Sequence, residues 1–165
     1  MRRTLFVTLL AAAVVLSGCE GPHVWDYQVF MPKEADLIGT YKVVRYHRVD
    51  AIEGLSKKDP IQIVLNTDHT VEFSDFPEFD GFGDFVICKL SGPGIWALTR
   101  GLPTPEIQFE LKAVPKSAVP ESPYVRRCYG NFSLPLVGHL NPYRLYVSIG
   151  DPDDDMGIEF ERVTR

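Results

Sequence analysis

The four histidines, the side chains best suited to metal binding or proton transfer near neutral pH, are widely separated in the sequence. None lies at metal-ligand spacing from another histidine or from a cysteine, and there is no Cys-x-x-Cys motif. The sequence also lacks a nucleophile elbow, a phosphate-binding loop and a dinucleotide fingerprint. We therefore expect neither an enzyme nor a metal or cofactor site. The histidines are His23, His47, His69 and His139.

A cluster of aspartates near the C-terminus has spacing that could suit a cation. Asp151, Asp153 and Asp155 alternate and are followed by Glu159, in partial agreement with a calcium loop. That loop requires glycine directly after its third acidic ligand, where this chain has Met156, and it requires flanking helices. We interpret the cluster as the solvated tip of a hairpin.

The first nineteen residues carry the strongest signal in the chain. Arg2 and Arg3 precede an almost wholly apolar, uncharged run over residues 5–16. This run is too short to span a membrane, which takes about 20 apolar residues. A charged start followed by such a run is typical of a secretory signal peptide, and the run ends in Leu16-Ser17-Gly18-Cys19.

Those four residues resemble the lipobox of bacterial lipoproteins. The resemblance implies that residues 1–18 are removed and that Cys19, the new first residue, carries lipid that anchors the chain in a membrane. Family members usually carry three acyl chains, and stable anchoring needs more than one. In some bacteria an acidic residue after the cysteine, mainly Asp, retains the protein at the inner membrane. Glu20 is a poor version of that signal, so the resemblance favours a periplasm-facing protein of the outer membrane. The alternative is a plain secretory signal with a chance cysteine.

Length and charge agree with one exported domain. The 165 residues suit a single domain, and 17 basic against 22 acidic residues give a net charge of −5. Removal of Arg2 and Arg3 with the signal leaves 15 basic residues and a net charge of −7. This acidic balance argues against a nucleic-acid binder, which needs a basic patch. Residues 19–36 are expected to be the lipidated N-terminus and a tether, and residues 37–165 the domain.

Two cysteines remain in the mature chain besides Cys19. In an oxidising periplasm the pair Cys88 and Cys128 predicts a disulfide, and two buried free thiols are the alternative. A loop of this length would stabilise the fold by about 4 kcal/mol in the chain-entropy model.

Beyond residue 36 the chain is a series of short strand-like segments. Apolar and polar residues alternate most clearly at 107–111 and 143–149. A polar turn at 66–69 predicts a hairpin, the sequence 91–94 predicts a break between two strands, and 115–123 predicts a loop with three prolines. No window has a sustained helical period, so we predict an all-β antiparallel barrel or sandwich of eight or nine strands. The other strand-like segments are 40–49, 61–65, 71–73, 85–90, 95–99 and 158–160.

The segments resemble a small lipocalin-like barrel of the calycin type. Gly39-Thr40-Tyr41 is similar to the opening Gly-x-Trp motif, and the segments 94–98, 107–111 and 149–162 are similar to the middle strand pair and closing hairpin. The resemblance implies an up-and-down barrel of about eight strands, in which Arg162 packs on Tyr41 and closes one end. It also implies an interior that can hold one small ligand, for which our candidates are Tyr41, Val43, Phe73, Trp96, Phe109 and Leu145.

The most unusual stretch is 75–85, where phenylalanine recurs every three residues among acids and glycines. We predict a loop at the barrel mouth, which either plugs the open end or anchors a partner. Its candidate residues are Phe76, Phe79 and Phe82.

Two functional hypotheses follow from these features. The first is a membrane-anchored binding module for a small apolar or amphipathic ligand. The second is a protein-interaction module, of an inhibitor or immunity type, that binds a secreted or periplasmic enzyme through its acidic surface and Phe-rich loop. An envelope protein with no separable ligand is a third, structural interpretation.

Overall fold

The computed structural model describes residues 28, 30–80, 82–101, 104–112, 128, 130–138, 141–151 and 155–163. The predicted signal peptide, Cys19, the first part of the tether and the proline loop 115–123 lie outside these residues. Within the described part, no helix has the length and apolar character needed to cross a membrane.

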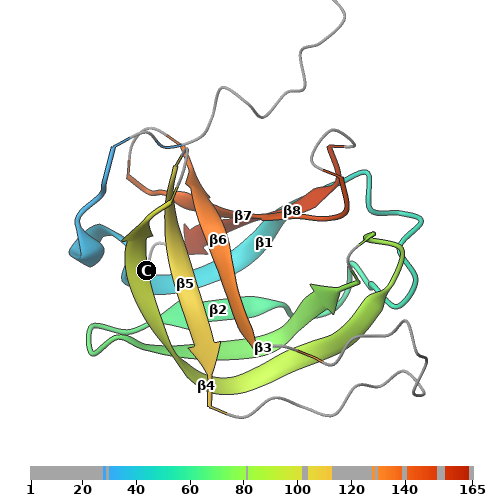
Figure 1. The fold of residues 1–165 in the computed structure, drawn as a ribbon, viewed down its shortest axis with the longest axis horizontal. Helices are drawn as coiled ribbons and strands as arrows, with labels where there is room; N and C mark the ends of the chain where they lie inside the picture. The colour runs from blue at the N-terminus through green and yellow to red at the C-terminus, as the bar shows by residue number, and fades with distance from the viewer. Residues whose placement is uncertain are drawn as a thin grey trace, which may run out of the picture.

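Eight antiparallel strands form one closed barrel in which each strand pairs with the next and β8 pairs with β1 (Figure 1). This confirms the predicted all-β, up-and-down barrel. A single turn of 3-10 helix, η1 (Glu34–Asp36), precedes the first strand. The strands are β1 (Gly39–His47), β2 (Gln62–Leu65), β3 (Thr70–Phe79), β4 (Val86–Arg100), β5 (Pro105–Leu111), β6 (Asn131–Val137), β7 (Arg144–Ser148) and β8 (Gly157–Val163).

The predicted break at 91–94 is wrong, because β4 runs through it as a single strand. Gly92 adopts a φ of +113°, which only glycine tolerates easily, and Gly94 has no room for a side chain, since a Cβ there would lie 2.5 Å from the Glu110 carbonyl oxygen. Glycines at such positions let a strand bend without losing its partners. Figure 1 shows β4 curving around the barrel as a result.

The sequence prediction omits strand β6, because Pro135 lacks a backbone N–H and argues against a strand, although Phe132, Leu134 and Leu136 alternate with Ser133 and Pro135. The strand pairs with β5 from Asn131 to Pro135 but with β7 only at Leu136 and Val137. Proline is tolerated where its missing N–H interrupts no ladder, and Pro135 lies beyond the short ladder to β7. The predicted number of strands is right only because two errors cancel: the prediction divides β4 into two strands and omits β6.

Phenylalanines from four strands fill the barrel interior. Neighbouring rings have centroid separations between 5.0 and 5.9 Å, within the range for favourable aromatic pairs. Phe73, Phe76 and Phe132 each contact three of the other rings. The rings belong to Phe73, Phe76, Phe109, Phe132 and Phe160.

We expect Phe73→Ala to lower the free energy of unfolding by about 3–5 kcal/mol, because it removes a ring that is 1% exposed and leaves a cavity among the other rings. Phe82→Ala is the matched control. Its ring is 80% exposed, so the same substitution should change stability by no more than about 0.5 kcal/mol. Urea unfolding of both variants measures the difference, and equal losses would contradict the packed interior.

Candidate functional site

The six interior candidates are mostly core side chains in contact with their neighbours. Tyr41, Phe73, Trp96, Phe109 and Leu145 are at most 3% exposed, and Val43 is half-buried. The ring of Trp96 is held by a hydrogen bond from Nε1 to the Asn66 carbonyl oxygen, 3.1 Å long. The structure therefore brings these residues together as the filling of the barrel.

The described residues line two hollows on the outer surface of the sheet. One, of about 450 Å³, lies over β4, β5 and β6, where exposed Ile95, Gln108 and Ser133 alternate with buried side chains. The other, of about 690 Å³, lies over β1 and β2 beside Lys42 and Arg162. Both are open surface depressions.

The predicted closing pair is brought together by strand register, since Tyr41 and Arg162 are opposite each other on β1 and β8. The Tyr41 hydroxyl donates to the Leu37 carbonyl oxygen (2.9 Å), and burial raises the pKa of this phenol well above its usual range, an effect that the nearby Arg162 guanidinium partly offsets. Arg162 Nη1 donates to the carbonyl oxygen of Asp36 (2.7 Å) and Nη2 to Asn141 Oδ1 (2.6 Å). These contacts fasten the segment before β1 onto the end of the barrel.

The Phe-rich stretch differs from the predicted loop. β3 extends through Phe79, and Phe76 is 3% exposed in the core, so Phe76 is not a residue of the barrel mouth. A register irregularity between Phe73 and Phe76, with Asp75 at a φ of +48°, inserts an extra residue into the strand. This bulge places the side chains of Phe73 and Phe76, three residues apart, on the same side of the strand. Phe79 is half-buried against the core.

Phe82 alone of the three mouth candidates projects into solvent, with 80% of its surface exposed. The carboxylate of Asp80 organises the loop behind it. Asp80 Oδ1 accepts hydrogen bonds from the backbone N–H of Asp84 (2.7 Å) and Phe85 (3.2 Å), and Oδ2 accepts one from Phe82 N–H (3.3 Å). The Asp80 carboxylate thus serves as the hydrogen-bond acceptor for three backbone N–H groups that have no strand partner in the loop.

Two glycines allow the Phe82 loop to pack closely against the connection between β7 and β8. A Cβ on Gly83 would lie 2.7 Å from Ile149 Cγ2, and one on Gly150 would lie 2.6 Å from the Phe82 carbonyl oxygen. Both glycines have positive φ, +79° and +70°. The loop is therefore packed as well as hydrogen-bonded, and Phe82 is exposed from a supported backbone.

Acidic residues surround Phe82. Asp84 follows it, Glu53 joins the loop through a bridge to Phe85, and exposed Asp151 follows the glycine that contacts the Phe82 carbonyl. The Glu53 amide donates to the Asp84 carbonyl oxygen (3.1 Å). We call this surface, made of Glu53, Asp80, Phe82, Asp84 and Asp151, the Phe82 end.

The chain enters the barrel at the opposite end. The backbone N–H of Gln28 donates to the Leu136 carbonyl oxygen (3.0 Å), and a Glu34 carboxylate oxygen lies 3.7 Å from His69 Nε2 in the β2–β3 turn. Strand direction alternates, so the β1–β2, β3–β4 and β7–β8 connections gather at the other end. Figure 1 shows η1 and the β2–β3 turn on the left and these three connections on the right.

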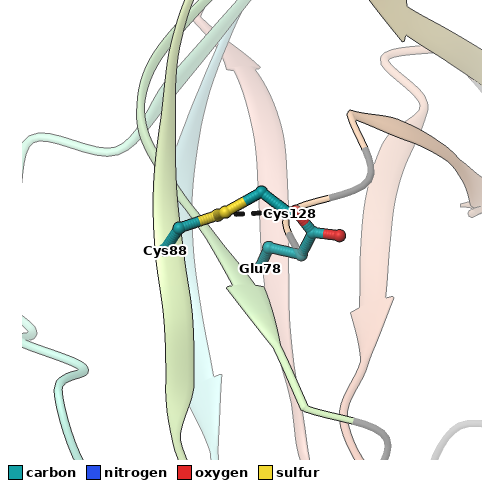
Figure 2. A group of neighbouring side chains, drawn as sticks. All are labelled: Glu78, Cys88 and Cys128. Carbon is teal, nitrogen blue, oxygen red and sulfur yellow. Dashed lines mark hydrogen bonds between the residues drawn. A yellow bond between two sulfur atoms is a disulfide. The ribbon is translucent and has the colours of Figure 1, made fainter. Parts of the chain in front are cut away.

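The predicted disulfide is confirmed between Cys88 and Cys128, whose Cα atoms are 6.3 Å apart (Figure 2). Glu78 Oε2 lies 3.5 Å from Cys88 Sγ. A carboxylate oxygen of Glu78 and the two cysteine sulfur atoms lie within 4.8 Å of one another, and all three residues are of types that bind metals. Cysteine binds a metal as a thiolate, however, and sulfur atoms joined in a disulfide are not thiolates. The group therefore acts as a cross-link between β4 and the chain before β6.

A buried carboxylate lies on the outer face of β8. Glu159 stands between Ile158 and Phe160, whose side chains face the interior, so its own points outward; it is nevertheless only 5% exposed. Arg144 donates to Glu159 Oε1, while Arg45 and His47 lie 3.8 and 3.5 Å from Oε2. These partners compensate the buried charge and join β1, β7 and β8.

Comparisons with known proteins identify no relative from which a function could be inferred. No family model, no curated protein and no solved structure matches the chain. The resemblance to bacterial lipoproteins and to lipocalin-like barrels therefore stays a prediction, and function is argued from specific residues because a fold alone does not define it. Sequence reasoning found Phe82 but missed Asp80, whose role depends on the loop geometry.

We expect Asp80→Ala to loosen the Phe82 loop, because three backbone amides lose their acceptor. A local loss of about 1.4 kcal/mol corresponds to an about tenfold faster amide exchange at Phe82, Asp84 and Phe85. Asp84→Ala is the control, since it keeps the Asp84 amide that Asp80 binds. Hydrogen exchange measured by NMR compares the two, and unchanged protection in the Asp80 variant would show that packing alone holds the loop.

Proposed function

We propose that this protein is a lipid-anchored lipoprotein of the bacterial cell envelope whose barrel binds a protein partner through the Phe82 end. The supporting observation is that Phe82 is 80% exposed on a loop fixed by Asp80 and by close packing on Gly150. Lipid on Cys19 would hold the chain at the membrane, and the barrel topology puts the Phe82 end opposite the entry of the tether.

An exposed aromatic ring on a supported backbone is suited to protein recognition. Aromatic side chains dominate binding energy when they fill a pocket at the centre of an interface. A ring that is already held in place loses less conformational entropy on binding than one on a loose loop. Phe82 combines both properties.

The charge of the Phe82 end indicates the kind of partner. Glu53, Asp84 and Asp151 are exposed around the ring, and the mature chain has a predicted net charge of −7. A basic protein with an apolar pocket would match this arrangement, and opposite charge would speed its association. A secreted or periplasmic enzyme with a basic surface fits this description.

The filled interior favours a protein partner over a small ligand inside the barrel. A ligand would have to displace rings such as Phe73 and Phe109, whose centroids are 5.2 Å apart in the core. An eight-stranded barrel either holds one small ligand or is filled by its own side chains, and here buried side chains from all eight strands pack together in the interior.

The partner surface can be tested by placing a photo-crosslinking amino acid at Phe82 in the full-length protein in its native cells. We expect one discrete adduct with a basic envelope or secreted protein, and no such adduct from the same group at Val44, which is 54% exposed on β1. Phe82→Ser should prevent the purified partner from binding while leaving stability unchanged.

Two results would contradict the protein-binding proposal. One is identical adducts from the two positions. The other is a small molecule that stays bound to the purified chain in native mass spectrometry and is released by substitutions in the interior but not at Phe82.

The anchor has its own test. We expect Cys19→Ser to abolish incorporation of a labelled fatty acid and to leave residues 1–18 attached, because the substitution removes the only thiol that the lipobox offers. Gel mobility and autoradiography measure both effects, with a Cys88→Ser/Cys128→Ser variant as a control that should still be labelled. Continued labelling of the Cys19 variant would refute the anchor.

A further inference from the structure

A second exposed aromatic residue lies at the end where the chain enters the barrel. Phe30 is 76% exposed and its neighbour Met31 is 43% exposed. Gln28, two residues before Phe30, is 3% exposed, and its backbone N–H donates to the Leu136 carbonyl oxygen. Pro32, directly after Met31, is also buried. The exposed Phe30 and Met31 therefore lie between two buried residues, Gln28 and Pro32, that pack against the barrel.

The contacts of the following residues fasten this segment to the barrel. Arg162 donates to the carbonyl oxygens of Asp36 (2.7 Å) and Ile38 (3.3 Å), and His69 lies 3.7 Å from Glu34. The apolar side chains thus project from the same end of the barrel as the start of β1. Lys33 is exposed next to them.

We propose that Phe30 and Met31 insert into the surface of the lipid bilayer and seat this end of the barrel on the membrane. The inference rests on the proposed anchor at Cys19. Ten residues lie between Cys19 and Phe30, and the eleven residue steps span at most about 40 Å, so the pair stays within that distance of the lipid on Cys19. Anchored barrels would then hold Phe82 away from the membrane.

The chemistry of the pair suits a lipid interface. Aromatic and other large apolar side chains gain free energy when they enter the boundary between headgroups and acyl chains, to a depth of about 5–10 Å. The Lys33 ammonium can stay at the headgroup level while its methylene chain lies along the apolar region. Two apolar side chains bind a bilayer weakly alone, but a covalent lipid keeps them at high local concentration.

Chemical lipidation allows a test that does not depend on natural processing. The strands and their described contacts all lie within residues 28–163, so the chain from Cys19 onward retains the barrel. With Cys88 and Cys128 in a disulfide, Cys19 is the single free thiol and can be coupled to a maleimide phospholipid in phosphatidylcholine vesicles. Trp25→Phe removes one background fluorophore, and Trp96 is 3% exposed in the core.

In this background we expect the emission of the F30W variant to shift to shorter wavelength when the protein is coupled to the vesicles, and to lose intensity when the vesicle lipids are brominated near the headgroup. The matched F82W variant, at a position equally exposed but at the opposite end, should be unaffected, as should the parent chain.

Two results would overturn the inference. Emission of F30W that is quenched no more than that of the parent would mean that the pair faces water or a protein partner. Equal quenching of F30W and F82W would mean that the barrel does not sit on this end. Absence of the fatty-acid label from the unsubstituted chain, or continued labelling of the Cys19→Ser variant, would instead refute the anchor itself, so the two proposals fail separately.

Discussion

The packing of phenylalanine rings inside the barrel is the interaction on which the rest of the structure depends. An eight-stranded barrel has an interior just wide enough to be filled by side chains. Here rings from β3, β5 and β6 pack on Phe73, and the β8 ring, Phe160, stacks on Phe76. Closure of the sheet also pairs each of the eight described strands on both sides, so none of them presents an open edge for aggregation.

The irregular features of the sheet are consequences of filling that interior. The bulge before Phe76 rotates β3 so that Phe73 and Phe76 both reach the core. The glycines of β4 let that strand curve around the rings, with Gly94 against the backbone of β5. Because the interior is occupied, the surface available for recognition lies at the ends and on the outer faces of the barrel.

The two ends of the barrel differ in a way that topology explains. Up-and-down strands place the N-terminal segment at one end and the β3–β4 loop at the other. Among the described residues, each end exposes one phenylalanine, Phe30 or Phe82, and in each case neighbouring contacts hold the backbone. The polarity of the molecule, with a membrane-facing end and a partner-facing end, would follow from chain direction and from these two side chains.

The sequence by itself determined the class of the fold, because alternation at 107–111 and 143–149 and the absence of helical periods need no knowledge of neighbours. It also predicted the disulfide from two cysteines and an expected compartment, and it singled out the stretch that holds Phe82. Tertiary structure alone decided which phenylalanines are buried. Residues three apart in a strand reach the same side only where a bulge adds a residue, as it does between Phe73 and Phe76. It decided equally that β4 continues through its glycines, that Pro135 lies in a strand, and that Asp80 binds three amides, because each depends on residues distant in the chain or on the path of the backbone.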